Sequence, residues 1–546
     1  MLRSVGDLGL SYDCVVVGGG HNGLVAANYL ARAGLRVAVF ERRGVLGGCC
    51  TTEELLPYAP GFKVNGGAID HILIQRTPII RDLGLDRFGL KYISLEPMFE
   101  VPFGDGRVLP FYSSLDKTVE EFARFSKRDA QNYMKQAKEW LKQESLLEAL
   151  MLDAPPKISE LLGMRGIGRA LFRPSLLSAL PDAASVDFNT MVRTIVISAN
   201  QLLNEEFEDE HVKVGLSAIF SLIFSTMSPS LPSSGLMAIM HTMLYKTGLK
   251  RPLGGSGKLV EALASSLRSL GGEVHLGAEV RKILVEDGSV AGVELADGRR
   301  VGAKLVVSNV DAQRTLTKLV EPGVVSEDLQ RKLKSLRITS YGMTFHAALH
   351  TLPEIKLSNG GSVQSLASGK LIALDALEDI EKAYHVANST RTLSPQPLLA
   401  VNFPTAYDPS LAPMDKHVLY CWAQFVPDDS PMIWEKDYHT FREDAYRKIY
   451  ERLTKYWPDL GDLIIDSTVE TPGDLEQRIW IPHGNTQHID PTLEQMYYYR
   501  PIPELSHYRT PIRGLYITGA GTHPGGGISG MPGYNTAKTI LKDLRS

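Results

Sequence analysis

Three glycines near the start of the chain are spaced to hold phosphate groups. Gly18, Gly20 and Gly23 lie between a short apolar run at 13–17 and a helical pattern of small and apolar residues over 24–34. Glycines at these positions permit a tight turn, let the backbone approach a pyrophosphate and allow a helix to pack closely on a strand. The N-terminus of that helix adds free N–H groups and a partial positive charge. The segment therefore predicts a dinucleotide-binding site.

An acidic residue follows the next apolar run. Glu41 stands at the end of a predicted strand over 36–40, where it is placed to accept hydrogen bonds from ribose hydroxyls. An acid at this position disfavours a 2′-phosphate, so the adjacent Arg42 and Arg43 do not indicate NADP. We expect these arginines to face solvent or to pair with phosphate. A glycine-rich turn in an unrelated α/β unit would not explain Glu41.

Two further glycine segments extend the predicted site. The pair Gly47–Gly48 follows the ribose acid closely, which suits a ligand with a flavin ring extending beyond the first pocket. Near the C-terminus, a strand over 514–518 leads into a glycine loop and then into a helix over 534–541. N–H groups near Gly530 are placed to stabilise negative charge on a reduced flavin ring. The alternative, a glycine linker without structure, conflicts with the strand and helix beside it.

The middle of the chain returns to the same sheet. A helix over 259–270 ends at a glycine pair, and strands follow over 273–276, 279–286, 290–295 and 305–309. The elements that hold the predicted site therefore come from three separate parts of the sequence.

Composition limits the class of protein. A chain of 546 residues is long enough for about two or three domains. The net charge of −4 gives no electrostatic reason to expect a nucleic-acid partner. The four cysteines lack metal-ligand spacing, so we expect no metal site and a reducing compartment. Residues 1–12 contain no apolar core of a secretory signal, and we expect a cytoplasmic protein.

One long stretch carries no charge. No Lys, Arg, Asp or Glu occurs between Lys213 and Lys246, and prolines at 229 and 232 interrupt the apolar pattern. A membrane span needs about 20 unbroken apolar residues. Two interpretations stay open. The segment is either a buried helical hairpin, or a helix pair that dips into one leaflet or lines an apolar tunnel. If it dips into the membrane, we expect Phe220 and Phe224 to contribute to membrane binding.

The motifs together resemble one family of flavoproteins. The segments at 18–25, 68–71, 500–503 and 519–533 are similar to the phytoene desaturase and carotenoid oxidoreductase superfamily, and most of all to desaturase-like bacterial β-carotene ketolases. The resemblance implies FAD and an α/β fold. It places a Rossmann-type FAD-binding domain in residues 1–100, 245–340 and 475–546, and a discontinuous α+β substrate domain in residues 101–244 and 341–474.

The resemblance also implies a reaction. We expect oxidation of the allylic ring carbon of β-carotene to a ketone, at a membrane surface from which the hydrophobic carotenoid is taken. A carotene desaturase or isomerase is the alternative within the same class. A non-catalytic escort protein for prenylated partners is the alternative of another class, and a homo-oligomer stays open.

Candidate site residues follow from the motifs and the resemblance. We expect catalytic or orienting roles for Asp70, His71, Arg500 and His523. The expected cofactor contacts are Gly18, Gly20, His21, Asn22, Gly23, Glu41, Arg42, Gly47, Gly48, Val280, Gly519, Gly521, Gly530 and Met531.

Overall fold

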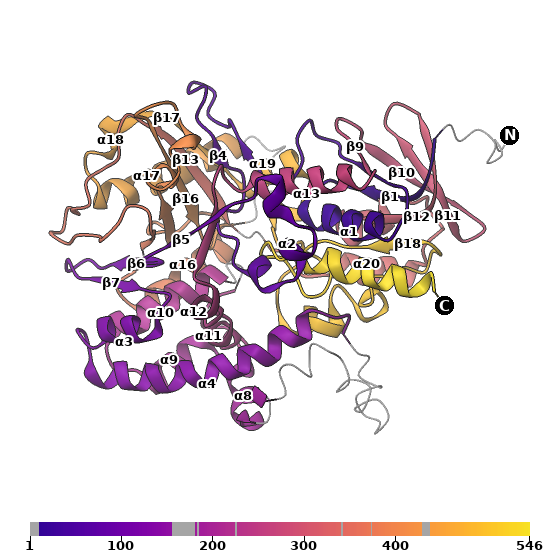
Figure 1. The fold of residues 1–546 in the computed structure, drawn as a ribbon. Coiled ribbons are helices and arrows are strands. Elements are labelled where there is room, and N and C mark those ends of the chain that lie inside the picture. The colour runs from indigo at the N-terminus through magenta and orange to yellow at the C-terminus, as the bar shows by residue number, and fades with distance from the viewer. Residues whose placement is uncertain are drawn as a thin grey trace.

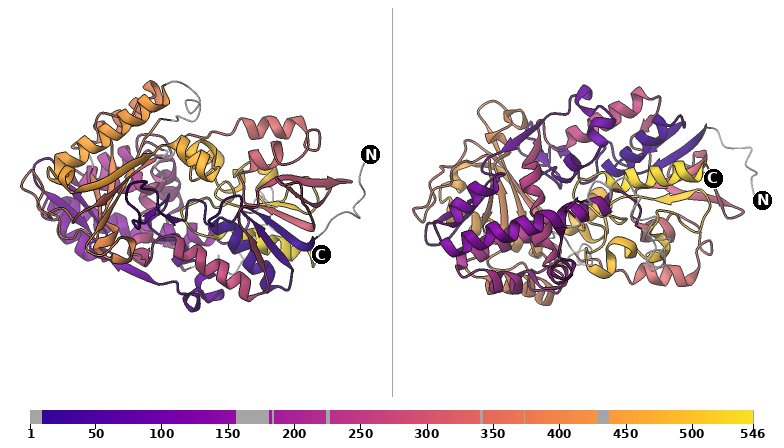
Figure 2. Two further views of the ribbon diagram at one scale, coloured as in Figure 1. Left: turned by 90° about the horizontal axis from the view of Figure 1, so that it is seen from above. Right: turned by 60° about the horizontal axis from the view of Figure 1, so that its bottom comes forward.

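Two seven-stranded sheets organise the chain, and they lie at opposite ends of the molecule (Figures 1 and 2). The computed structural model describes residues 10–155, 181–182, 185–223, 227–339, 342–372, 374–427 and 437–545. The α/β fold class predicted from the sequence is confirmed.

The first sheet is parallel at its centre. Strand β1 (Leu10–Val17) pairs in parallel with β2 (Val37–Phe40) on one side and β12 (Arg300–Ser308) on the other. Strands β9 (Glu273–His275) and β18 (Leu515–Ile517) extend the parallel part, and the β10–β11 hairpin pairs antiparallel with β12. Central parallel strands are buried on both faces, which explains their continuous apolar runs.

Three helices cover one face of this sheet near the glycine segments. Helix α1 (His21–Arg32) packs against α13 (Gly257–Ser269) and α20 (Met531–Asp543) (Figure 1). The approach of α20 depends on Gly533, since a Cβ there would lie 2.1 Å from the carbonyl oxygen of Asn22. The three parts of the sequence predicted to form one domain therefore meet in one layer.

The second sheet is mostly antiparallel and has two buried faces. Its strand order is β17-β13-β16-β15-β14-β6-β7, with only the β14–β6 pair parallel. Along β16 (His417–Ala423), Leu419 and Cys421 pack toward α17 (Tyr438–Tyr456), whereas Tyr420 and Trp422 belong to the core on the opposite face. Alternation of side chains along a strand assigns each residue to one face.

Helices from the middle of the sequence form the core under that opposite face. Helices α10 (Glu210–Ile223), α11 (Leu236–Met240) and α12 (Met243–Thr247) come from the uncharged stretch, and most of its described residues are buried. Among the described residues, no helix is long and apolar enough to cross a membrane. The described part of the stretch is therefore a buried group of helices, as one of the two interpretations predicted.

The remaining bounds complete the description. The other strands are β3 (Thr52–Glu53), β4 (Val64–Asn65), β5 (Tyr92–Leu95), β6 (Phe99–Pro102), β7 (Val108–Phe111), β8 (Leu249–Pro252), β10 (Val280–Glu286), β11 (Ser289–Leu295), β13 (Met343–Leu349), β14 (Gly369–Ile372), β15 (Leu399–Asn402) and β17 (Ile464–Glu470). The other α-helices are α2 (Ile79–Asp82), α3 (Leu115–Phe122), α4 (Lys127–Met151), α8 (Phe188–Val196), α9 (Ala199–Glu206), α14 (Ala312–Thr317), α15 (Glu327–Lys334), α16 (Leu377–Thr390), α18 (Leu460–Leu463) and α19 (Pro472–Ile479).

All strands of the first sheet lie within residues 1–100, 245–340 and 475–546. The second sheet takes β7 and β13 to β17 from the other predicted segments, and β6 spans their boundary at residue 100. The division into domains stays a prediction, and the strand positions agree with it.

Candidate active site

The carboxyl ends of four parallel strands converge on one cavity. Gly18 follows β1, Glu41 follows β2, Asn309 follows β12 and Gly519 lies just beyond β18, and all four line a cavity of about 540 Å³. Ligands of open parallel sheets bind outside the carboxyl ends of the strands. The sheet itself thus places residues far apart in sequence around one site.

The first glycine segment leaves no room for side chains. A Cβ on Gly20 would lie 2.6 Å from Nδ2 of Asn309, and one on Gly23 would lie 2.5 Å from the carbonyl oxygen of Gly18. Gly18, Gly20, His21 and Asn22 line the cavity, while Gly23 serves the packing of α1 on the sheet. This is the close backbone approach that a pyrophosphate requires.

The second glycine pair joins the first. The N–H of Gly47 donates to the carbonyl oxygen of Gly19 at 3.0 Å, and Gly47 adopts a φ of +124°, which side chains rarely allow. Both Gly47 and Gly48 line the cavity. The two loops therefore form one continuous backbone surface.

Glu41 is buried and is held by the same loops. Its Oε2 accepts from the N–H of Gly19 at 2.8 Å, and its Oε1 accepts from the N–H of Arg43 at 2.9 Å. A carboxylate accepts several hydrogen bonds, so both oxygens keep acceptor capacity toward the cavity. Arg42 also lines the cavity, but its Nη2 donates to the carbonyl oxygens of Gln477 (2.7 Å) and Arg478 (3.0 Å).

Several buried polar atoms at this end of the cavity have no hydrogen-bond partner within the described residues. They are His21 Nε2, Asn22 Oδ1, Asn309 Oδ1 and His488 Nδ1, all on cavity-lining residues. Burial lowers the pKa of His21 to about 4 and that of His488 to about 3, so both rings are neutral. Buried polar atoms are nearly always satisfied in native proteins. Together with the glycine surface, these atoms fit a bound dinucleotide.

The C-terminal glycine loop closes another side of the cavity. Gly519 and the run Gly525–Ile528 line it, and the N–H of Gly526 donates to Oε1 of Gln487 at 2.7 Å. Val280, at the start of β10, lines it as well. Gly521 lies against His488 instead, whereas Gly530 caps α20 and Met531 begins it, both buried behind the lining.

Asp70 and His71 are adjacent in sequence, but they bind different partners. Asp70 lines the cavity, and its Oδ1 accepts from Nε of Arg251 at 2.7 Å. His71 is fully buried behind the lining, with its ring nitrogens 3.0 Å from the hydroxyls of Tyr92 and Ser256. Burial lowers the pKa of His71 to about 3. These contacts favour a structural role for His71 and leave Asp70 facing the ligand space.

Arg500 is committed to the backbone. Its guanidinium is buried and donates to the carbonyl oxygens of Ala520, Gln487, Gln495, Ile489 and Asp490 at 2.7 to 3.4 Å. Burial lowers its pKa to about 9, which still leaves it protonated at neutral pH. Arg500 thus holds two cavity-lining loops together.

His523 lines the cavity between helix and loop. Its Nε2 lies 3.1 Å from the carbonyl oxygen of Leu150, and the ring of Tyr497 meets it edge-on at 5.3 Å. The predicted catalytic residues therefore do not form one cluster, although Asp70, Arg500 and His523 share one cavity.

Beyond these residues the cavity becomes apolar. Helices α10 to α12 and one face of the second sheet form this part. The apolar lining consists of Phe99, Leu371, Ala400, Trp422, Ile219, Leu222, Leu236, Met240, Met243 and Leu244. The uncharged stretch is therefore both buried and part of an apolar tunnel, so two of its predicted features coincide.

The adjacent cysteines lie on different sides of the lining. Cys49 faces the cavity, and burial raises its pKa to about 11, which keeps it a thiol. Cys50 lies behind the lining and donates to the carbonyl oxygen of Ser256 at 3.2 Å.

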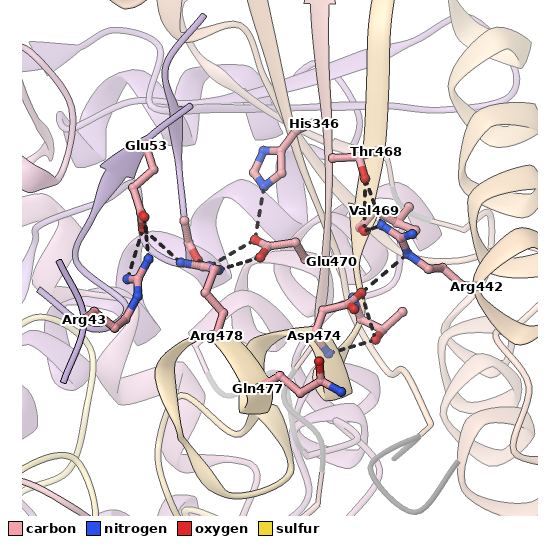
Figure 3. A network of polar contacts seen from close by, with 12 residues as sticks. Arg43, Glu53, His346, Arg442, Thr468, Val469, Glu470, Asp474, Gln477 and Arg478 are labelled. Atoms are coloured by element: carbon pink, nitrogen blue, oxygen red, sulfur yellow. Dashed lines mark hydrogen bonds and ion pairs between the residues drawn. The ribbon is translucent and has the colours of Figure 1, made fainter. Parts of the chain in front are cut away.

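An ionic network fastens the two sheets together next to Cys49 (Figure 3). Arg478 binds Glu53, which follows the second glycine loop, at 3.0 Å, and Glu470 of β17 at 2.6 Å. Arg43 also pairs with Glu53, and His346 lies 3.8 Å from Glu470. The network fixes the second glycine loop relative to the second sheet.

Three residues that contribute to the cavity were not predicted from the sequence: Asn309, Gln487 and His488. The position of Asn309, directly after a predicted strand, was the available signal. Gln487 and His488 lie in a segment without regular periodicity, and only the fold brings them to the cavity.

The comparisons with known proteins agree with this geometry. The family model for flavin containing amine oxidoreductase matches residues 23–534. The chain belongs to this family. Members carry flavin, and the chain is accordingly an FAD-dependent oxidoreductase of the branch that includes phytoene desaturases.

Three relatives of this flavin family cover almost the whole chain. A mouse protein described as pyridine nucleotide-disulfide oxidoreductase domain-containing protein 2 is 30% identical over 99% of this chain and 95% of its own length. A polypeptide of the limonene dehydrogenase of Castellaniella defragrans is 28% identical over 97% and 95%. A lycopene-forming phytoene desaturase of Pseudescherichia vulneris is 25% identical over 97% and 99%.

The fold is shared with a solved oxidoreductase from Methanosarcina mazei. That structure has a TM-score of 0.60 at 18% identity and covers 98% of this chain and 100% of its own. The Rossmann-type FAD fold and the membership of the carotenoid oxidoreductase superfamily, both expected from the motifs, are confirmed.

Proposed function

We propose that this FAD-dependent oxidoreductase acts on a long apolar isoprenoid, with a carotenoid as substrate and the allylic ring carbon of β-carotene as the atom oxidised to a ketone. The observation that carries the proposal is the single cavity that joins the glycine surface to the apolar lining of α10 to α12. A substrate without charge is held by shape and apolar contact in such a space.

Two relatives support an isoprenoid. Their names, phytoene desaturase and limonene dehydrogenase, describe removal of hydrogen from isoprenoid hydrocarbons. The same names favour a second candidate, desaturation of a linear carotene. Both reactions need the same cavity, so the product distinguishes them.

The residues of this chain have separable tasks in either reaction. Bound FAD supplies a two-electron acceptor. The backbone of Gly18 to Gly23, Glu41 and the orphaned atoms of His21, Asn22, Asn309 and His488 are placed to hold its nucleotide part, and the run Gly525–Ile528 to border its ring. The apolar lining excludes water and orients the polyene.

Pigment analysis tests the proposal. The chain is expressed in hosts that accumulate β-carotene, lycopene or phytoene, and the carotenoids are identified. We expect mono- and diketo products from β-carotene, and isotopic oxygen then identifies the source of the carbonyl. Conversion of phytoene or lycopene alone supports the desaturase candidate. A purified protein that never retains FAD supports the escort alternative and contradicts both reactions.

We propose further that the protein works in the cytoplasm at a membrane surface. All four cysteines are free thiols, which suits a reducing compartment. Helix α8 exposes Phe188, Val192 and Val196 at helical spacing, while its Ile195 lines the cavity. Figure 1 shows α8 at the lower edge of the molecule. An apolar outer face over the tunnel suits uptake of a lipid-soluble substrate.

Flotation with liposomes tests the membrane proposal. The double variant Phe188→Glu/Val192→Glu is expected to lose most of the binding of the unmodified chain. Met414 is 88% exposed elsewhere on the surface, and Met414→Glu is the matched control that should float normally. Equal flotation of all three proteins would contradict a role of α8.

A further inference from the structure

A polar patch interrupts the wall of the substrate cavity. Asp70, Asn402 and Tyr420 line the cavity together with the apolar residues of the second sheet. We refer to these three residues as the polar patch. A space built only for hydrocarbons would not need them, because burying polar groups without partners costs free energy.

One guanidinium fixes two members of the patch. Arg251 is fully buried behind the wall, and its Nε donates to Oδ1 of Asp70 at 2.7 Å. Its Nη2 donates to Oδ1 of Asn402 at 2.5 Å, and its Nη1 donates to the carbonyl oxygen of Ala367 at 3.3 Å. The side chains of Asp70 and Asn402 are thus held side by side at the cavity surface.

The third member stands next to the second. Asn402 of β15 and Tyr420 of β16 are opposite each other in the antiparallel register, so their side chains lie on the same face. Within the part of the chain that the structure describes, Asp70 Oδ2, Asn402 Nδ2 and the Tyr420 hydroxyl form no hydrogen bond. The patch therefore offers acceptors and donors to whatever occupies the cavity.

The charges around the patch cancel. Arg251 balances Asp70, and the neighbouring buried pair of Lys370 and Glu100, 3.8 Å apart, is balanced as well. A cationic ligand group would leave an uncompensated charge in a low-dielectric space, which is costly. A neutral hydroxyl donates to Asp70 and accepts from Asn402 or Tyr420 without adding charge.

We propose that the polar patch binds a hydroxyl group of the substrate, so that the enzyme prefers a hydroxylated carotenoid to the parent hydrocarbon. The proposal rests on the proposed function and specifies its substrate. If a ring ketone forms by successive oxidations, the alcohol that precedes the ketone is the species that the patch retains in the cavity.

A competition experiment measures this preference without turnover. The FAD-loaded protein is incubated anaerobically and in the dark with equal amounts of 4-hydroxy-β-carotene and β-carotene in one detergent. The protein is then recovered on affinity resin, and the bound pigments are quantified by chromatography. A hydrogen bond to a charged group predicts a bound ratio of at least about tenfold in favour of the alcohol.

Variants connect the ratio to the patch. Tyr420→Phe removes one hydroxyl and should lower the ratio about threefold. The double variant Asp70→Leu/Arg251→Met replaces the ion pair by apolar side chains and should bring the ratio near one. Removing both charges together avoids an unpaired buried charge. Tyr446→Phe is the matched control, because that hydroxyl binds Ser467 on the other face of the sheet, and its ratio should equal that of the unmodified protein.

The outcomes separate this inference from the proposed function. Equal binding of both pigments by the unmodified protein overturns the hydroxyl site and leaves the apolar cavity in place. A preference that survives both patch variants also overturns it. If neither pigment binds, the hydroxyl site and the carotenoid proposal fail together. Because the unmodified protein and Tyr420→Phe already decide the question, misfolding of the double variant does not protect the proposal.

Discussion

Gly20 and Asn309 face each other so closely that a Cβ on Gly20 would lie 2.6 Å from Nδ2 of Asn309. One residue follows the first strand of the sheet and the other follows a strand almost 300 residues later, within the same cavity wall. The relationship explains why glycine is required there, beyond the approach of a phosphate.

Replacing Gly20 should therefore abolish flavin binding. We expect Gly20→Val to push Asn309 aside and occupy the pyrophosphate position, lowering retained flavin at least tenfold, measured by the absorbance of the purified protein near 450 nm. Gly44 has open space around its Cβ position, so Gly44→Ala should remain yellow. A yellow Gly20→Val protein would contradict the assignment of the site.

Phe220 should contribute to stability and not to membrane binding. Its ring is fully buried and lies 4.9 Å from the ring of His241. We expect Phe220→Ala to lower the free energy of unfolding by about 3–5 kcal/mol, measured by chemical denaturation. Phe188 is 67% exposed, and Phe188→Ala should change it by less than about 0.5 kcal/mol. Phe224, the other residue of the uncharged stretch expected to contribute to membrane binding, lies outside the described residues.

His71 should make the protein less stable in acid. Burial lowers its pKa to about 3 in the folded chain, whereas an unfolded histidine titrates near about 6.5. Between these values the unfolded chain binds a proton that the folded chain does not. The stabilisation is therefore complete above about pH 6.5 and is lost as the pH falls. Denaturation of His71→Gln at several pH values should show a slope smaller by about 1.4 kcal/mol per pH unit. An unchanged slope would mean that His71 protonates in the folded state.

Arg500 should behave as a structural residue in substitution experiments. Lysine cannot reproduce its fork of donors to loop carbonyl oxygens, so we expect Arg500→Lys to lower the free energy of unfolding by about 3 kcal/mol. Arg513 binds a single carbonyl oxygen at an exposed site, and Arg513→Lys should be nearly neutral. Full stability of Arg500→Lys combined with loss of turnover would instead support the catalytic role first predicted for it.

Local patterns in the sequence were sufficient for the nucleotide end of the molecule. The glycine spacing, the acid at Glu41 and the strands over 273–309 are features of neighbouring residues, and each has a backbone cause that acts over one turn, strand or helix. The fold class, the cofactor and the positions of most first-sheet strands followed from them. The start of β12 at Arg300 was missed, because its first residues are ordered by pairing with β11.

The substrate end was decided by the tertiary structure. Adjacent residues such as Asp70 and His71 point to opposite sides of the cavity wall, and no pattern in the sequence indicates which one faces the ligand. The polar patch joins residues 70, 251, 402 and 420, which meet only when the second sheet packs against the loop after the second glycine pair. Likewise, the uncharged stretch was recognisable as apolar, but whether it faces lipid or core depends on what packs against it. Contacts between distant segments carry no local periodicity, so only the packed chain reveals them.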